Sequence, residues 1–330
     1  MTKLPVGVVG VGHLGSLHAK MYAQIPNVAL VGVVDTDNAK AKQIASEYST
    51  KAYQNIDEFL QNVKAISVVT PTSMHHSVAE QAIKRGVHVF IEKPITGSTD
   101  EAKRLVELSK KNDVKIQVGH IERFNSALLA LEKYHIQPMF IESHRLAQFN
   151  PRGTDVAVVL DLMIHDIDII LSLVNSPVKN IHANGIAVVS DTIDIANARL
   201  QFENGCVANV TASRISQKKM RKMRMFQRDA YISVDFSEGF AEVFRLVGQA
   251  DPSLQTTMML GEINSGKLKR KIVYEQPTIT EVNALKYELE LFVDAVQNGK
   301  QPVVTAEEGL RALEVAQQIV EIIHQQKFQL

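Results

Sequence analysis

The sequence predicts an α/β protein in two parts, a doubly wound parallel sheet followed by a part built on an antiparallel sheet. Three observations support this prediction. Strand and helix patterns alternate at βαβ spacing over the first 120 residues, strands of alternating polarity fill the middle of the chain, and two helical patterns close it. A length of 330 residues also favours two domains over one.

The N-terminal part alternates short apolar strands with amphipathic helices. Its strand candidates are Val- and Ile-rich runs at 6–9, 29–34, 65–69, 87–91 and 115–118. Its helix candidates are at 14–25, 38–48, 73–85 and 99–111. Strands that are apolar on both faces and alternate with helices predict a parallel sheet covered on both sides.

The pattern changes near residue 121. We expect helices at 122–134 and 155–174, a strand at 139–147, and alternating strands at 186–189, 195–202, 207–213 and 230–235. Two further helices, 283–298 and 306–324, flank a Gly299–Pro302 break. These patterns predict a first domain at 1–120 and a second at 121–330, with the C-terminal helices packing back towards the first domain.

Bulk composition excludes several classes of protein. Thirty-six basic residues balance thirty-six acidic ones, which gives no global field for nucleic acid or a membrane surface. No apolar stretch approaches the length of a membrane span. The single Cys206 forms no internal disulfide, and the N-terminus runs straight into the first strand, so we expect a cytoplasmic protein without a signal peptide.

A glycine motif, Gly10-x-Gly12-x-x-Gly15, joins the first strand to the first helix. A first glycine makes the tight turn, a second lets backbone approach a pyrophosphate, and a third lets the helix pack closely on the sheet. The helix N-terminus offers free N–H groups to phosphates. Framed by strand, helix, strand and acid, the motif predicts a dinucleotide site that includes His13 and Leu14.

Asp35 ends the second strand, twenty residues after Gly15. A carboxylate in this place accepts hydrogen bonds from both ribose hydroxyls of an adenosine. A 2′-phosphate would instead face Asp35 and Asp37, with no basic residue before Lys40. The sequence therefore predicts NAD rather than NADP as the cofactor.

Two clusters follow strands of the same sheet, at the carboxyl edge where ligands bind in such folds. The first is Thr70, Pro71, Thr72 and His75, and the second is Glu92, Lys93 and Pro94. Taken alone, Lys93 has the pattern of an exposed loop lysine, and His75 that of a residue that caps or lines a helix start.

A third cluster, Asp161, His165 and Asp168, lies on the predicted helix 155–174. At 3.6 residues per turn these three side chains span an arc of about 60°, and Asp166 points away from them. They can therefore face one cleft, although His165 could equally be a core histidine bonded by the two aspartates. No further Cys or His completes a tetrahedral metal site, and we expect no metal.

Most of the chain resembles the glucose–fructose oxidoreductase / inositol dehydrogenase / rhizopine-catabolism (Gfo/Idh/MocA) family. The matching segments are GVVGVGHLG at 7–15, VVD at 33–35, VVTPTSMHHSVAEQAIKRGVHVFIEKP at 68–94, VGHIERF at 118–124, DLMIHDID at 161–168 and ELFVDAVQNGKQPVVTAEEGLRALEVA at 290–316. The resemblance implies a Rossmann domain followed by an α/β domain with an open, mostly antiparallel sheet. It also implies assembly into homodimers or homotetramers through that sheet.

The resemblance assigns roles to particular residues. Lys93 and His165 would flank the nicotinamide and the reacting hydroxyl, Asp161 would contact substrate, and Arg123 would lie near the junction of cofactor and substrate. The whole set of candidate cofactor contacts is Gly10, Gly12, His13, Leu14, Gly15, Asp35, Thr70, Pro71, Thr72, His75, Glu92 and Lys93.

The chemistry implied is oxidation of a secondary hydroxyl of a sugar, with hydride transfer to NAD. His165 is the better base because an imidazole titrates near neutrality, whereas Lys93 would stabilise the developing alkoxide or, if desolvated, serve as the base itself. Segments such as GHIERFN are most similar to the UDP-N-acetylglucosamine 3-dehydrogenase group, which acts on nucleotide sugars. A dehydrogenase of free inositol or monosaccharides and a non-catalytic NAD-binding regulator remain alternatives.

A basic segment bears on the choice of substrate. No acidic residue occurs from Gly205 to Arg228, and Arg221 and Arg224 belong to a cluster of seven basic residues within it. The segment is either a solvated turn with an edge strand or a site for the diphosphate of a nucleotide sugar. The candidate substrate contacts are Arg123, Asp161, His165, Asp168, Arg221 and Arg224.

Overall fold

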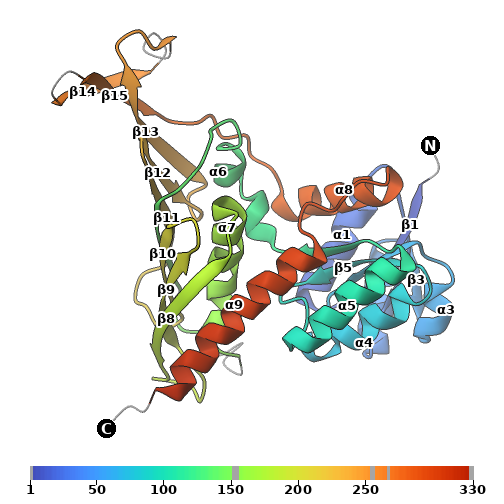
Figure 1. The fold of residues 1–330 in the computed structure, drawn as a ribbon. Helices are drawn as coiled ribbons and strands as arrows, with labels where there is room; N and C mark the ends of the chain where they lie inside the picture. Colours follow the sequence, from blue (N-terminus) through green and yellow to red (C-terminus); the bar gives the residue numbers. More distant parts are fainter. Residues whose placement is uncertain (1–2, 151–155, 253–256, 266–267, 327–330) are drawn as a thin grey trace. The chain divides into compact units, whose positions relative to one another are not determined.

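A computed structural model describes residues 3–150, 156–252, 257–265 and 268–326. It contains two compact units (Figure 1). The first comprises the chain up to Phe124 together with Asn283–Glu314, and the second comprises Asn125–Val282 and the chain from Val315 onward. The predicted fold class, a Rossmann sheet plus an open and mostly antiparallel sheet, is confirmed.

The first unit is built on a six-stranded parallel sheet in the order β3-β2-β1-β4-β5-β6. Its strands are β1 (Leu4–Val9), β2 (Val28–Val34), β3 (Lys51–Tyr53), β4 (Ala65–Val68), β5 (His88–Glu92) and β6 (Ile116–Gly119). Its helices are α1 (His13–Gln24), α2 (Asn38–Glu47), α3 (Ile56–Leu60), α4 (Thr72–Ile83), α5 (Thr99–Asn112), α8 (Ala284–Gln297) and the first part of α9 (Ala306–Gln325). This order places a switch point between β1 and β4, where a dinucleotide binds in folds of this type.

Apolar side chains from both ends of the chain fill the core of the first unit. Val6 and Val8 of β1 and Tyr22 of α1 are fully buried, and Phe292 of α8 joins the same cluster. The rings of Phe90 and Phe292 meet edge to face with centroids 5.8 Å apart. Helix α8, which follows the nine-stranded sheet of the second unit in sequence, thus completes the core of the first.

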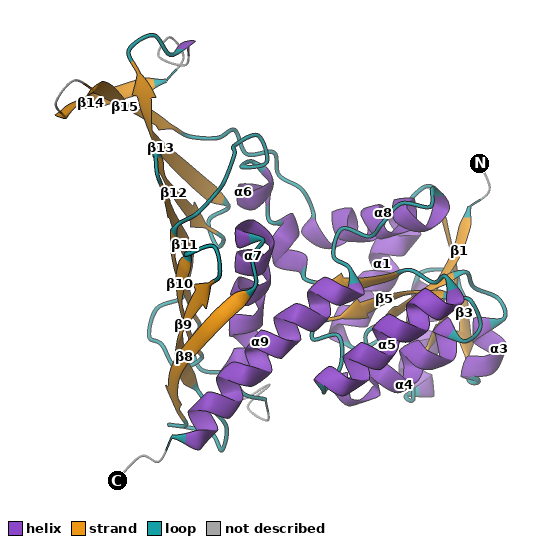
Figure 2. Ribbon diagram, in the orientation of Figure 1, coloured by secondary structure: helices purple, strands orange, loops and turns teal. Residues whose placement is uncertain are grey.

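The second unit is built on a nine-stranded sheet in the order β14-β15-β13-β12-β11-β7-β10-β9-β8. Its strands are β7 (Phe140–Leu146), β8 (Val178–Ile186), β9 (Ile195–Phe202), β10 (Val207–Ser213), β11 (Met220–Gln227), β12 (Ala230–Asp235), β13 (Phe240–Gly248), β14 (Met258–Ser265) and β15 (Leu268–Glu275). Every pairing is antiparallel except that of β7 with β10. Helices α6 (Ser126–Leu129) and α7 (Ile164–Val174) lie on one face of this sheet (Figure 2).

Several predicted elements differ from the structure. The predicted helix 122–134 is a 3₁₀ turn at Ile121–Phe124 followed by the short α6, because the side chain of Asn125 accepts from Ala127 N at 3.1 Å and starts a new helix. The predicted strand 186–189 is wrong: β8 ends at Ile186, and the next residues form a loop. The predicted start of the long helix at residue 155 lies outside the described residues.

The basic segment contains two strands, β10 and β11, both inside the sheet rather than at its edge. β11 pairs with β12 on one side and with β7 on the other, so the interpretation of this segment as an edge strand is wrong. In β11, Lys222 and Arg224 alternate with the buried Met223 and Met225, a period-2 pattern that the clustering of charge obscured. No helix among the described residues is both long and apolar enough to cross a membrane.

Candidate active site

The three motif glycines have different surroundings. Gly10 has φ +86° and lies against β4, where an added Cβ would meet the carbonyl oxygen of Val69 at 2.7 Å. A Cβ on Gly15 would lie 1.8 Å from the carbonyl oxygen of Gly10. A Cβ on Gly12, by contrast, would meet no atom of the described chain within 4 Å. Gly10 and Gly15 are therefore required by the fold, whereas Gly12 leaves room for a ligand.

Helices α1 and α4 begin without a side-chain cap. The helices α2 and α5 are capped by Asp37 and Ser98, whose side chains accept backbone N–H groups. At the starts of α1 and α4, Gly12 and Pro71 supply no such bond. The first N–H groups of these two helices are left to other partners, which suits the phosphates of a dinucleotide.

Asp35 joins the end of β2 to the glycine loop. Its Oδ2 accepts from Val11 N at 2.7 Å, and its Oδ1 accepts from Asp37 N at 2.9 Å. These bonds hold a half-buried carboxylate beside the loop, where a ribose could reach it. The exposed His13 and Leu14 follow at the start of α1.

The strand β4 carries a second set of candidates at the same edge. The buried hydroxyl of Thr70 has no hydrogen-bond partner in the part of the chain that the structure describes. His75 is buried, and its two ring nitrogens lie 2.9 Å from the carbonyl oxygens of Pro94 and Thr70. Burial lowers the pKa of His75 despite these contacts. The ring thus ties the loop after β4 to the loop after β5, and Thr72 is the first residue of α4.

Glu92 is the last residue of β5 at this edge, and Lys93 follows it. The Glu92 Oε1 lies 3.0 Å from the Nε2 of His18, and Oε2 accepts from Lys93 N at 3.3 Å. Burial alone would raise the pKa of Glu92, but the hydrogen bond and charge of His18, with the charge of Lys93, hold it below its ordinary value. Lys93 is half-buried and precedes a cis peptide bond to Pro94.

In the second unit, Asp161 lies in a π-helical turn, Val159–Met163, that leads directly into α7. A π turn adds a residue to each turn, so the arc calculated for a regular α-helix does not hold between Asp161 and His165. Both residues are half-buried, whereas Asp168 is only 1% exposed. Such wide turns frequently mark functional sites, and nothing in the sequence pattern predicted one here.

Asp166, which was expected to point away from the site, anchors α7 to the sheet. Arg145 of β7 donates to it through both Nε and Nη2, and the Nη2 contact to Oδ1 is 2.8 Å. Both side chains are nearly fully buried. A buried, two-point ion pair of this kind fixes the rotation of α7 and hence the direction of the neighbouring His165.

The structure separates Arg221 from Arg224. Arg221 is opposite Arg145 in the β7–β11 register and so lies on the sheet face that carries α7, whereas Arg224 is opposite Glu142 on the other face. Arg224 Nη1 lies 3.7 Å from Glu142 Oε2. The prediction that both arginines serve one diphosphate site is therefore wrong, because side chains three residues apart on a strand point to opposite faces. Arg123, in the first unit, forms a 2.9 Å ion pair with Glu308.

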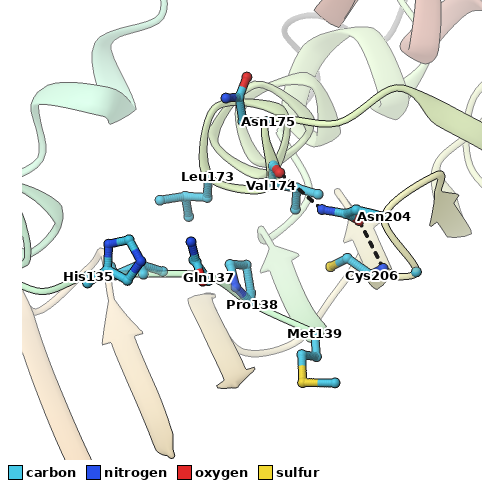
Figure 3. Close-up of a pocket in the computed structure, with 11 residues that line it drawn as sticks. His135, Gln137, Pro138, Met139, Leu173, Val174, Asn175, Asn204 and Cys206 are labelled. Carbon is cyan, nitrogen blue, oxygen red and sulfur yellow. Dashed lines mark hydrogen bonds between the residues drawn. The ribbon is translucent and has the colours of Figure 1, made fainter. Parts of the chain in front are cut away.

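The hollow drawn in Figure 3 lies at the opposite end of α7 from His165. Asn204 lines it, donating to the carbonyl of Val174 at 3.3 Å and accepting from Cys206 N at 3.0 Å. Burial raises the pKa of the Cys206 thiol to about 11, so the thiol stays protonated at neutral pH. The predicted catalytic residues do not line this hollow.

Sequence reasoning missed two contributors to the site, His18 and Arg145. Both occupy positions that face the core of their unit, where the pattern predicts an apolar residue. A polar side chain at such a position is the available signal, because a buried polar group requires a partner.

The fold and the glycine loop define an NAD-binding oxidoreductase with a separate second domain. Residues 4–120 match the family described as an oxidoreductase family with an NAD-binding Rossmann fold, and residues 135–242 match the GFO/IDH/MocA C-terminal domain. The chain belongs to the Gfo/Idh/MocA family.

Named relatives cover almost the whole chain. The UDP-N-acetylglucosamine 3-dehydrogenase of Acidithiobacillus ferrooxidans is 35% identical over 97% of both chains, and its crystal structure superposes with a TM-score of 0.87 over 98% of each. A scyllo-inositol 2-dehydrogenase (NAD(+)) of Bacillus subtilis is 28% identical over 93% of this chain and 90% of that protein. A scyllo-inositol dehydrogenase of Lactobacillus casei, solved with bound NAD(H), shares the fold at 20% identity with a TM-score of 0.77, covering 98% of this chain and 97% of that one.

Proposed function

We propose that the protein oxidises a secondary ring hydroxyl of a nucleotide-diphospho-sugar, with UDP-N-acetylglucosamine, oxidised at C3, as the substrate. The observation that carries this proposal is the full-length similarity, at 35% identity, to a UDP-N-acetylglucosamine 3-dehydrogenase. The position of Arg221 beside Arg145, on the sheet face that carries α7, supports a site for an anionic substrate.

The first unit supplies the cofactor site. The phosphates of NAD suit the uncapped starts of α1 and α4 and the open side of Gly12. The Thr70 hydroxyl, which has no hydrogen-bond partner among the described residues, suits the phosphates and ribose as well. Asp35 would accept hydrogen bonds from the adenosine ribose hydroxyls. His75 supports the loops after β4 and β5 rather than contacting the cofactor with a free ring nitrogen. Bound NAD would supply the hydride acceptor.

We assign the reaction at the hydroxyl to three side chains, His165, Lys93 and Asp161. The hydroxyl proton must leave as the hydride leaves, so a base is required within hydrogen-bond reach of that oxygen. We assign this role to His165, because an imidazole ordinarily titrates near neutral pH. Lys93 stabilises the developing alkoxide as a cation, and Asp161 orients the sugar. We place Arg123, which is paired with Glu308, and the buried Asp168 on the substrate side of the site.

The activity is tested by adding NAD and UDP-N-acetylglucosamine to the purified protein and following NADH, with free inositol offered separately. Lys93→Ala and His165→Ala should each lower turnover by about 10²–10⁴-fold while NAD affinity stays within a few-fold. The exposed Lys111 and His182 give matched alanine controls. Efficient oxidation of free inositol instead would contradict the proposed substrate and assign inositol in its place. Binding of NAD without turnover of any sugar would favour a non-catalytic regulator.

The two arginines of β11 test the substrate class directly. UDP alone should bind the NAD-loaded protein, and its affinity should fall with salt as exposed charges are screened. Arg221→Ala should weaken UDP binding at least 10-fold, whereas Arg224→Ala, on the opposite face of the same strand, should leave it unchanged. Equal effects of the two substitutions, or no binding of UDP, would contradict the assignment.

We also propose that the protein forms a homodimer or homotetramer through the open face of its nine-stranded sheet. Five aromatic rings, on β7, β11, β12, β13 and β15, form a continuous row on this face, with neighbouring centroids 5.0–5.9 Å apart: Phe140, Phe226, Tyr231, Phe244 and Tyr274. Phe226 is 37% exposed within the chain. The other four rings are half-buried, and a partly exposed aromatic row of this length favours a protein partner. The unpaired Cys206 is consistent with a reducing cytoplasm.

A further inference from the structure

A chain of buried hydrogen bonds runs beneath the end of β5. The Nε2 of His18 lies 3.0 Å from Glu92 Oε1, and its Nδ1 lies 3.1 Å from the hydroxyl of Ser67, which in turn lies 2.9 Å from the hydroxyl of Tyr22. The three residues behind Glu92 are fully buried. The chain therefore links α1 and β4 to the last residue of β5, one position before Lys93.

The direction of the hydrogen bond between His18 and Glu92 follows from the charge of Glu92. Its carboxylate is held ionised, as the lowered pKa indicates, and an ionised carboxylate only accepts hydrogen bonds. His18 therefore carries a hydrogen on Nε2 and donates a hydrogen bond to Glu92. The His18 Nδ1 contacts the Ser67 hydroxyl, and the ring meets that of Phe90 edge to face, with centroids 5.3 Å apart. Together these contacts leave the imidazole one orientation.

The carboxylate of Glu92 connects the His18 ring to the backbone of Lys93. One carboxylate oxygen takes the bond from His18, and the other accepts from the backbone N–H of Lys93 at 3.3 Å. The carboxylate also lies against Gly119 of β6, where an added Cβ would meet Oε1 at 3.0 Å. The carboxylate is confined between two strands and a helix, and the backbone of Lys93 is fixed to it.

We propose that His18 is a positioning residue that, by donating to Glu92, holds Lys93 in the orientation needed for catalysis. This inference rests on the role given to Lys93 in the proposed function. Without a donor at the Nε2 position, the half-buried Glu92 carboxylate would lose its hydrogen bond from His18 and would turn or take up a proton. A displacement of about 1 Å at a reacting group costs on the order of 100-fold in rate.

The geometry supplies a matched pair of variants. In His18→Gln the side-chain amide reaches the place of Nε2 and can still donate to Glu92, whereas in His18→Asn it reaches only the place of Nδ1, near Ser67. His18→Asn should lower kcat with UDP-N-acetylglucosamine about 10-fold to 100-fold, with KM and NAD affinity within a few-fold of the original values. His18→Gln should restore kcat to within about 3-fold.

A second measurement needs no substrate. Hydrogen exchange of the Lys93 amide, read by mass spectrometry in the protein without ligands, should be several-fold faster in His18→Asn than in the original protein or His18→Gln. Glu92→Gln should have the kinetic effect of His18→Asn, and combining the two should add no further loss. His88→Asn is the control, because His88 accepts from Lys115 N at the other end of β5, 3.0 Å away.

The outcomes separate this inference from the proposed function. If the original protein oxidises no sugar offered, the proposed function fails, and the exchange of the Lys93 amide still decides whether His18 holds this segment. Equal kcat in the Gln and Asn variants, additive losses in the double variant, or unchanged amide exchange would each overturn the inference. A loss in His88→Asn matching that in His18→Asn would also overturn it, because it would show a general effect of stability.

Discussion

At the scale of single residues, the glycine loop separates the demands of folding from those of binding. Gly12→Ala adds a methyl group to open space, at a residue whose φ of −59° suits alanine. We expect the free energy of unfolding to change by less than about 1 kcal/mol and NAD affinity to fall at least 10-fold, because the methyl group occupies the approach to the pyrophosphate. Calorimetric titration with NAD and thermal unfolding measure the two effects.

Gly15→Ala is the comparison for that experiment. Its added Cβ would meet the Gly10 carbonyl at 1.8 Å, so we expect a loss of about 1–3 kcal/mol of stability. If Gly12→Ala bound NAD as the original protein does, the loop would not approach the pyrophosphate in the way described.

The choice of cofactor also depends on one residue. Asp35→Ser removes a carboxylate that would repel a 2′-phosphate, so the ratio of kcat/KM with NADP to that with NAD should rise at least 10-fold. Use of NAD should itself decline, since Asp35 also holds Val11 N. Asp191→Ser, at an exposed aspartate of the second unit, is the control and should leave this ratio unchanged. A preference for NADP in the original protein would contradict this interpretation of β2.

At the scale of elements, one carboxylate organises the loop between β8 and β9. Asp194 accepts from the backbone N–H groups of Val188, Val189 and Ser190 at 2.8–3.0 Å, and from the hydroxyl of Ser190 at 2.7 Å. The neighbouring Ile193 accepts from Val158 N at 2.9 Å, next to the π-helical turn that carries Asp161. The loop thus supports the turn that presents a predicted catalytic residue.

This arrangement predicts how stability depends on pH. Burial alone would raise the pKa of Asp194, but the bonds from Ser190 and the three amides lower it from 3.8 to about 2. A depressed folded-state pKa contributes stability above the unfolded value and loses it as pH falls from about 4 towards 2. Asp194→Asn should therefore cost about 1–3 kcal/mol at pH 7, and the difference from the original protein should shrink at pH 2.5.

Denaturant unfolding at the two pH values measures this difference. Asp191→Asn, an exposed neighbour in the same loop, should change stability little at either pH. The loss of unfolding free energy in Asp194→Asn could also stay the same at pH 2.5 as at pH 7. That result would show that the amides do not stabilise the charge of the carboxylate.

At the scale of the whole molecule, the aromatic row on the open sheet face predicts self-association. Tyr231→Glu places a charge between the rings of Phe226 and Phe244, so we expect the dissociation constant of the assembly to rise at least 10-fold. Sedimentation velocity over a range of concentrations measures it. Val303→Glu, at another exposed apolar residue of the chain, should leave assembly unchanged. A monomeric original protein, or an unaffected variant, would contradict the proposed interface.

Local patterns in the sequence were sufficient for the fold class and the cofactor loop. The βαβ alternation, the spacing of Gly10, Gly12 and Gly15, and the acid at Asp35 are all short-range features, and the structure confirms the parallel sheet that they predict. Strands β9, β10 and β12 were also predicted closely, because their two faces differ cleanly in polarity. β11 was misjudged because the basic residues at its start obscure the alternation of its two faces.

Only the tertiary structure decided which polar residues meet. The sequence by itself identified Asp161, His165 and Lys93 as candidates, but it gave no sign of the π-helical turn or of the pairing of Asp166 with Arg145. The sequence pattern also assigned Arg221 and Arg224 to one site, whereas the register of β11 with β7 places them on opposite faces of the sheet. The physical reason is that the partner of a buried polar group lies far away in the chain, so that His18 meets Glu92 across 74 residues once the sheet has formed.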